Sequence, residues 1–335
     1  MKSEQMEDGE DIPFIFSSII RAATVNRKNG EIMHGIIPLW KPQGMTSHDC
    51  VVKLRKLLQI KKAGHTGTLD PGVEGVLPVC IGRATKIVQY LTNADKVYEA
   101  EVTLGISTTT EDQFGDIVER KPVKTPVERK NIEMALKKLT GEIIQIPPMY
   151  SAVKVKGKRL YEYAREGIEV ERPERKVMIY ELILLDDQEQ FTGEPVKFNI
   201  RIKCSKGTYI RTLAVMIGEA LGYPAHMSHL VRISQAGITK QDCFTFEEIE
   251  MLIKNGRKEA IFIPVETALN ELPKLEIHDT LANRVKNGAV LPVPEELKNA
   301  KLPIAMVYKG KVIAIYKHHP TKTGLIKPDR VLVTE

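Results

Sequence analysis

One aspartate, Asp70, lies in the glycine-rich stretch GHTGTLDPGVEGVLPVCIGRATK at residues 64–86. Its carboxyl group is ionised at neutral pH, and the proline that follows removes one backbone donor. The surrounding glycines allow close approach to another backbone or a ligand, and the apolar flanks keep bulk water away. Such a carboxylate can act as a nucleophile or a general base. The same residues also fit an Asp-Pro turn whose side chain bonds to its own backbone, so both interpretations stay open.

Three further side chains could bind an anion or a base. Arg211 stands at the predicted start of a helix, where the helix dipole disfavours a cation, so it indicates an anionic partner or a structural carboxylate. Tyr98 and Tyr209 could each stack on a base or pack in the core. Together these residues favour an enzyme that acts on a polyanion, without deciding it.

Patterns for metals and nucleotides are weak in this chain. His226 and His229 form an HxxH motif, but no acid or third ligand accompanies them, so a surface or loop role is favoured over a metal site. The GxxxxGK[ST] and GxGxxG patterns of phosphate-binding loops do not occur. Four cysteines are far apart and form no CxxC pair, which argues against zinc and favours reduced thiols in a cytoplasm: Cys50, Cys80, Cys204 and Cys243.

The overall composition is that of a soluble globular protein. The chain has 335 residues, which predicts two domains, and 42% of them are apolar and 27% charged. We find neither a membrane-spanning stretch nor a signal peptide in it. The net charge is +6, and because residues 1–33 hold four basic and six acidic side chains, the rest carries +8. Basic runs at 53–62 and 154–165 mix with apolar or aromatic residues, which suits a polyanion surface but also an ordinary solvated helix face.

The elements that must position Asp70 follow from hydrophobic periodicity. An apolar run at 35–40 leads through the KPQG turn to a helix that Ser47 can cap. A second apolar segment, 76–81, follows the glycine-rich loop. Alternation predicts strands at 98–106 and 196–204.

The remaining periodic segments predict three helices and a hairpin. Apolar stripes indicate helices at 132–139 and 210–221. The Thr245-x-x-Glu248 capping box indicates a third helix, which ends at Asn255-Gly256. The segment 306–317 predicts a hairpin around Lys309-Gly310 in a small β-rich domain.

The glycine-rich stretch resembles the signature of the TruB family of tRNA pseudouridine synthases. The similarity continues, in the family's order, through about two thirds of the chain. The matching segments are KPQGMTSHD (41–49), DKVYEAEVTLG (95–105), STTTEDQFGDI (107–117), IPPMYSAVKVKGKRLYEYAREGIEV (146–170) and CSKGTYIRTLA (204–214). It extends weakly into HLVRISQAG (229–237). Two positions depart from it. Glu74 replaces a small residue, and Val231 stands where a second basic residue is common, which is expected to weaken one RNA contact without changing the target.

The resemblance implies an α/β (α+β) fold. The expected arrangement is a mobile N-terminal extension at 1–33, a catalytic domain at 34–250 with a bifurcated, mixed and largely antiparallel sheet, and a PUA-like RNA-binding domain at 272–335. The implied activity is the isomerisation of uridine-55 in the tRNA T loop to pseudouridine by base flipping, without metal or cofactor. The resemblance also implies a cytoplasmic monomer that needs no membrane and no obligatory protein partner. The alternative functions are those of a guide-RNA-dependent synthase and of a non-catalytic tRNA-binding or RNA-folding protein.

The resemblance also assigns residue roles. Asp70 is the nucleophile, Arg211 its ionic partner, and Tyr98 stacks on the base and is implicated in proton removal. The candidate RNA contacts, besides Tyr98, are Lys41, His65, Tyr209 and Leu230, where His65 helps to open the T loop and Leu230 lines the pocket.

Overall fold

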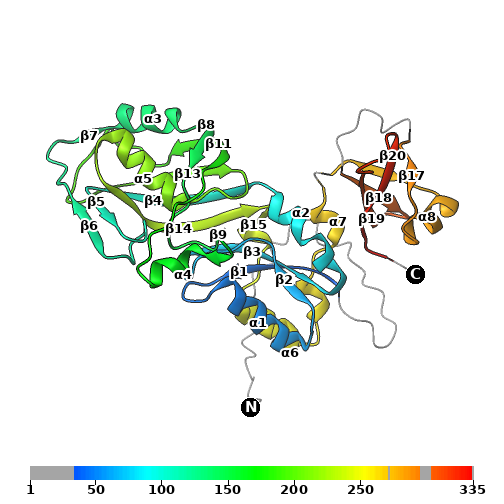
Figure 1. Cartoon of the computed structure of the whole chain (residues 1–335). Coiled ribbons are helices and arrows are strands. Elements are labelled where there is room, and N and C mark those ends of the chain that lie inside the picture. Colours follow the sequence, from blue (N-terminus) through cyan, green and yellow to red (C-terminus); the bar gives the residue numbers. More distant parts are fainter. Residues whose placement is uncertain (1–33, 271, 295–302, 334–335) are drawn as a thin grey trace, which may run out of the picture. The chain divides into compact units, whose positions relative to one another are not determined.

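The computed structural model describes residues 34–270, 272–294 and 303–333 (Figure 1). The N-terminal extension expected at 1–33 lies outside the described residues. Two principal sheets form: a nine-stranded sheet built from the first part of the chain and a five-stranded sheet near its end. None of the described helices is long and apolar enough to cross a membrane.

The large sheet is mixed and largely antiparallel, which confirms the predicted fold class. Its only parallel pairing in the described chain is short and joins Glu74 and Gly75 to Val231 and Arg232. In sheet order, the strands are β1 (Gly35–Lys41), β3 (Glu74–Ile81), β14 (Ala225–Gln235), β4 (Lys96–Leu104), β13 (Val196–Cys204), β11 (Arg175–Leu184) and β8 (Gly141–Gln145), with β2 (Ala63–His65) beside β3 and β15 (Ile238–Thr239) beside β14.

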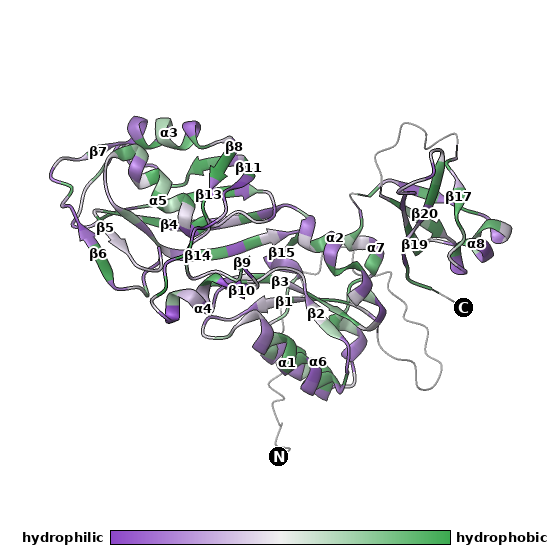
Figure 2. Ribbon diagram, in the orientation of Figure 1, coloured by the Kyte–Doolittle hydropathy of each residue, from purple (hydrophilic) through white to green (hydrophobic). Residues whose placement is uncertain are grey.

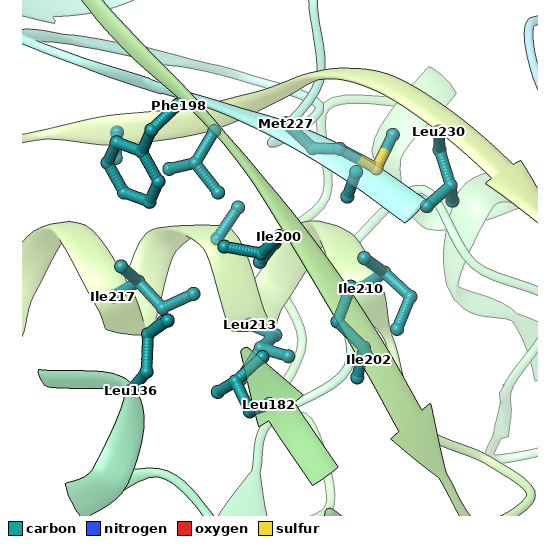
Figure 3. Close-up of a cluster of buried hydrophobic side chains, with 14 of the residues drawn as sticks. Leu136, Leu182, Phe198, Ile200, Ile202, Ile210, Leu213, Ile217, Met227 and Leu230 are labelled. Carbon is teal, nitrogen blue, oxygen red and sulfur yellow. The ribbon is translucent and has the colours of Figure 1, made fainter. Parts of the chain in front are cut away.

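The alternating segment at 196–204 forms strand β13 as predicted. Its apolar residues are buried on one face, where helix α5 (Ile210–Leu221) lays its apolar stripe against the sheet (Figure 3). Ile200 and Leu213 are both essentially inaccessible to solvent in this cluster. Because α5 follows β13 after a five-residue connection, 205–209, and is fixed by this packing, the residues at its first turn have a defined position.

Helices α1 (Ser47–Leu58) and α6 (Phe246–Lys254) share a second apolar cluster. Figure 2 shows both as mixed purple and green, as expected for helices with one exposed face. Thr245 and Glu248 form the predicted capping box of α6. The prediction that Ser47 caps α1 is wrong: Thr46 is the N-cap and Asp49 its reciprocal partner, which leaves the Ser47 hydroxyl group available for a contact elsewhere.

The C-terminal sheet has the strand order β16 (Lys274–Glu276), β18 (Ile304–Tyr308), β19 (Lys311–His318), β20 (Leu325–Val331) and β17 (Leu291–Pro292). Strands β18 and β19 form the predicted hairpin. At its tip Lys309 and Gly310 have φ values of 51° and 73°, the left-handed conformation that two-residue hairpin turns need.

The other helices and strands are short or peripheral. The helices are α2 (Val88–Asn93), α3 (Arg129–Lys138), α4 (Leu160–Arg165), α7 (Val265–Ala268) and α8 (Asp279–Lys286), with 3-10 turns η2 (Gly82–Ile87), η3 (Lys240–Asp242) and η4 (Lys258–Ile261). The strands are β5 (Ile106–Thr108), β6 (Ile117–Arg120), β7 (Val127–Glu128), β9 (Lys154–Val155), β10 (Lys158–Arg159) and β12 (Gln190–Phe191).

Candidate active site

Asp70 lies in the loop 66–73, which joins β2 to β3 next to the parallel strand pair. The Lys41 side chain fixes this loop and is fully buried. Its ammonium group donates to the carbonyl oxygens of Val73 at 2.5 Å, Pro42 at 2.9 Å and Pro71 at 3.4 Å. Because Lys41 has no exposed surface here, its burial argues for a structural role, and the expected RNA contact stays a prediction.

Two further contacts hold the backbone on each side of Asp70. The Leu69 amide donates to the Ser47 hydroxyl oxygen at 2.8 Å, and that hydroxyl group lies 3.2 Å from the Leu69 carbonyl oxygen. The Gly44 amide donates to the Pro71 carbonyl oxygen at 2.8 Å. The Asp70 side chain itself stays 45% exposed. A fixed backbone and an accessible carboxylate are what a positioned reagent requires.

Arg211, in the first turn of α5, forms an ion pair with this carboxylate. Its Nη2 lies 3.1 Å from Asp70 Oδ2, and only 7% of the arginine side chain is exposed. Nη1 and Nη2 also donate to the carbonyl oxygens of Thr110 and Tyr150, both at 2.9 Å. Nη1 is 3.8 Å from Asp112 Oδ2. The guanidinium group is therefore fixed on several sides, and the Asp70 carboxylate is held against it.

Arg232 is a buried cation on β14, at the position where this strand pairs with both β3 and β4. It pairs opposite Tyr98 in β4 and opposite Gly75 in β3, and its side chain is fully buried. Its Nε donates to the Val76 carbonyl oxygen at 2.7 Å and Nη2 to that of Gly67 at 3.2 Å. Arg232 thus supports the glycine-rich loop from the strand side.

Buried positive charge gathers beneath the loop. Burial lowers the pKa of Lys41, and burial with the nearby charge of Arg232 lowers the pKa of Lys96 to about 8. The Lys96 ammonium group donates to the carbonyl oxygens of Thr92 and Ala94 at 2.9 and 2.7 Å. Lys41, Lys96 and Arg232 thus place three cationic side chains against the glycine-rich loop.

Tyr98 and Leu230 lie in the apolar cluster under the loop, together with Leu69 and Val73. Each of the two is 7% exposed. Burial raises the pKa of the Tyr98 phenol, so the hydroxyl group is protonated at neutral pH. Tyr98 therefore presents a neutral ring to the site, and Leu230 contributes to the apolar wall beside it.

His65 ends strand β2, close before Asp70 in the chain. Its Nδ1 is buried and has no hydrogen-bond partner within the described residues. Burial, with the charge of Arg232, lowers the pKa of the imidazole. A neutral imidazole with a free ring nitrogen can donate to or accept from a base edge or a 2′-hydroxyl group.

Tyr209 is the residue before the first turn of α5. Gln145, fully buried at the end of β8, holds its backbone from both sides: the Tyr209 amide donates to Gln145 Oε1 at 3.0 Å, and Gln145 Nε2 donates to the Tyr209 carbonyl oxygen at 3.2 Å. Gln145 was not singled out from the sequence, because nothing local distinguishes a glutamine at a strand end.

The loop 109–116 forms another side of the site and was also missed as a functional element. Thr110 and Asp112 both face Arg211. Glu111 is half-buried, has a φ of 62°, and accepts a hydrogen bond from the Thr212 hydroxyl group at 2.7 Å. A left-handed non-glycine residue next to an ion pair is a type of strain that concentrates at functional sites.

Metal ligands do not gather at this site. Over the part of the chain that the structure describes, no group of three or more His, Cys, Asp and Glu side chains is arranged to hold a metal ion. His226, one of the two HxxH histidines, instead places Nδ1 2.8 Å from the Ile106 carbonyl oxygen.

Two family models match adjacent parts of the chain. One, described as the N-terminal domain of TruB family pseudouridylate synthases, covers residues 55–210, and one described as the tRNA pseudouridylate synthase B C-terminal domain covers 211–270. The five-stranded sheet lies beyond both matches.

Curated bacterial proteins match nearly the whole chain. Proteins called tRNA pseudouridine synthase B from Bacillus thuringiensis (strain Al Hakam) and Geobacillus thermodenitrificans are each 56% identical, over 90% and 89% of this chain and 98% and 99% of theirs. The one from Bacillus subtilis (strain 168) is 55% identical over 90% of this chain and 98% of its own.

Among solved structures, chains from two complexes are similar. A chain in a Cbf5-Nop10-Gar1 complex has 31% identity and a TM-score of 0.68, covering 89% of this chain and 85% of its own. A chain in an H/ACA RNP bound to a substrate RNA containing 2′-deoxyuridine has 28% identity and a TM-score of 0.67, with the same coverage.

Proposed function

The chain belongs to the TruB family of pseudouridylate synthases, and from this premise we propose that it converts uridine-55 in the T loop of tRNA to pseudouridine. It is accordingly an isomerase that acts on tRNA, and the resemblance seen in the sequence is confirmed. The observation that carries the proposal is the half-exposed Asp70 carboxylate held 3.1 Å from the buried Arg211 guanidinium group.

The reaction exchanges one bond for another within a single nucleotide. The N1–C1′ glycosidic bond breaks, the uracil turns, and C5 bonds to C1′; the C5 proton is lost and N1 gains a proton. Atoms and charge balance without any oxidant, reductant or leaving group. Asp70 acts as the nucleophile, at C6 of uracil or at C1′ of ribose, and departs when the new bond has formed.

The surrounding residues bind and orient the flipped base. Tyr98 and Tyr209 offer rings on which a uracil can stack, and Leu230 closes the apolar wall. Arg211 aims the carboxylate through the ion pair at 3.1 Å. His65, as a neutral imidazole, replaces contacts that the uridine loses when it leaves the T loop.

For Lys41 we propose a positioning role in place of RNA contact. Two of its three carbonyl acceptors, Pro71 and Val73, directly follow Asp70 in the nucleophile loop, so its ammonium group fixes the path of that loop. It does not touch the reacting atoms and acts through Asp70.

The protein is proposed to work alone, as a cytoplasmic monomer on the T arm of tRNA, without metal or cofactor. Its four cysteines are free thiols, as a reducing compartment favours. The domain division is proposed as 34–250 for catalysis and 272–335 for RNA binding in a PUA-like domain; the separate five-stranded sheet supports it. The similarity to Cbf5 keeps a guide-dependent synthase as the second candidate, but the 56% identical relatives favour the stand-alone enzyme.

The test uses unmodified tRNA transcript with tritium at uracil C5. Purified protein without added metal, cofactor, guide RNA or partner is compared with Asp70→Asn for tritium release and for the position of the modified nucleotide. Release by the natural sequence alone, mapped to the T loop, supports the proposal. Tight tRNA binding without release would favour a binder or a guide-dependent synthase, and release by Asp70→Asn would exclude Asp70 as the nucleophile.

A further inference from the structure

Phe114 is a large aromatic side chain exposed beside the nucleophile loop. Its relative exposure is 70%, the highest among the large exposed hydrophobic residues of the described chain. We propose that Phe114 is a substrate-binding residue, a platform on which a base flanking the target uridine stacks. This inference rests on the proposed function and extends it to a residue that the proposed mechanism does not use.

The ring lies directly against the loop that carries Asp70. A Cβ atom added at Gly72 would come within 2.3 Å of Phe114 Cε2 and 2.7 Å of Cζ, so one edge of the ring contacts the Gly72 backbone. Gly72 is two residues beyond Asp70. With one edge on this loop and most of its surface in solvent, the ring borders the position that the reacting nucleotide must occupy.

The backbone that presents Phe114 is fixed before any substrate arrives. Asp112 Oδ1 accepts hydrogen bonds from the Phe114 amide at 2.9 Å and from the Thr110 hydroxyl group at 2.6 Å. Thr109 and Asp116 close the loop by two bonds, from the Thr109 amide to the Asp116 carbonyl oxygen and from the Asp116 amide to the Thr109 hydroxyl oxygen. An exposed aromatic ring on a constrained loop loses little entropy when it stacks on a ligand.

The loop is also tied to the catalytic machinery. Thr110 and Asp112 both contact the Arg211 guanidinium group, and Glu111 bonds to Thr212 in the same helix. The position of Phe114 is therefore coupled to that of the Asp70–Arg211 pair. A base stacked on the Phe114 ring would therefore have a fixed position relative to the Asp70 carboxylate.

Base flipping creates a demand for such a platform. When the target uridine leaves its stack, the neighbouring bases each lose a stacked face, and an aromatic side chain can replace it. Every base has a π-face, so the contact does not need a particular sequence. Simple packing of Phe114 on Gly72 is the competing explanation, and it requires only an apolar side chain.

Three variants separate stacking from packing: Phe114→Tyr keeps the ring, Phe114→Leu keeps an apolar side chain, and Phe114→Ala removes both. Met134→Ala is the matched control, because Met134 is an exposed apolar residue on α3, 55% accessible. Each variant is assayed for tritium release as a function of tRNA concentration. Binding is measured in the Asp70→Asn background and folding by thermal denaturation.

We expect Phe114→Tyr and Met134→Ala to behave like the natural sequence. Phe114→Leu and Phe114→Ala should raise KM and the tRNA Kd about ten-fold, the scale of one base–aromatic stack, with a small change in kcat. A double-mutant cycle combines Phe114→Ala with tRNA that carries an abasic nucleotide on the 5′ or the 3′ side of the target uridine. At one of these positions the effect of Phe114→Ala should largely disappear.

The outcomes distinguish this inference from the proposed function. If the natural sequence releases no tritium, the proposed function fails first. If it is active but Phe114→Leu matches it, packing on Gly72 is sufficient and the stacking role is overturned. Equal losses on intact tRNA and on both abasic tRNAs would overturn it as well.

Discussion

Arg211 Nη2 lies 3.1 Å from Asp70 Oδ2, and this pair joins the first turn of α5 to the loop between β2 and β3. The arginine is the fixed partner: it is buried and also donates to two backbone carbonyl oxygens, whereas the aspartate is half exposed. The direction of the carboxylate is therefore determined by the helix. Changes to the guanidinium geometry should impair the reaction more than the binding of tRNA.

Arg211→Lys is the sharpest test of this geometry. Lysine keeps the positive charge but lacks the planar fork that reaches the carboxylate and the two carbonyl oxygens together. We expect the single-turnover rate to fall about 10- to 100-fold, or about 1.4 to 2.8 kcal/mol of transition-state stabilisation, with an unchanged tRNA Kd. A variant with a normal rate would show that charge alone is sufficient and that the fixed direction is unimportant.

Local patterns predicted the elements that frame the site. The alternation at 196–204, the apolar stripe at 210–221 and the Thr245 capping box became β13, α5 and α6 because each is determined by residues a few positions apart. Asp70 was identified as a candidate from its glycine-rich surroundings, but its ion pair depends on a residue far along the chain. The pairing came from a family resemblance and not from periodicity.

Local patterns did not predict the contacts that residues far apart in sequence make. In the segment Thr46-Ser47 either hydroxyl group can cap a helix; Thr46 does so because Asp49 reciprocates, and Ser47 binds Leu69 across the fold. Lys41 resembles a surface lysine after an apolar run, yet its acceptors come mostly from residues 71–73. Arg232 was overlooked for the same reason.

Lys41→Met should lower the reaction rate and leave RNA contacts intact. Methionine fills the space but leaves up to three carbonyl oxygens without their donor, each at a cost of about 1–3 kcal/mol if it stays dry. We expect a lower melting temperature and a lower kcat. The slope of log Kd against log salt should be unchanged, because no phosphate contact is lost.

A lysine that did contact phosphate would behave differently. Its loss would reduce that slope by about 0.7 to 0.9 and raise Kd while stability stayed normal. Finding this pattern for Lys41→Met would restore the RNA-contact assignment. Lys130→Met, on the exposed face of α3, is the control for a generic loss of charge.

Gly75→Ala should be severely destabilising. Gly75 has a φ of 126°, and an added Cβ would lie 2.3 Å from the Arg232 carbonyl oxygen and 2.7 Å from its amide nitrogen. Backbone strain and steric overlap each cost about 1–3 kcal/mol, so we expect a loss of about 3 kcal/mol or more in urea denaturation. Gly67→Ala is the control, because the nearest atoms to its added Cβ are 3.5 Å away or more. Similar stability for the two alanine variants would contradict the close approach of β3 and β14.

The stability of the protein should depend on His65 in mildly acidic solution. Burial lowers the pKa of His65 from its ordinary value of 6.5, so the folded protein resists protonation there while the unfolded chain accepts a proton. Stability contributed by the neutral imidazole is therefore complete above pH 6.5 and is lost as the pH falls from 6.5 toward the folded pKa. The slope from this group is at most about 1.4 kcal/mol per pH unit.

Urea denaturation at pH 7.5 and 5.5 measures this slope for the natural sequence and for His65→Asn. The other titrating groups are common to both proteins, so the difference between the two slopes isolates residue 65. We expect the natural sequence to lose more stability than the variant on acidification. Equal losses would mean that His65 is as easily protonated in the folded protein as in the unfolded chain. The imidazole would then carry a charge in acid, and a neutral ring at the tRNA loop would exist only at higher pH.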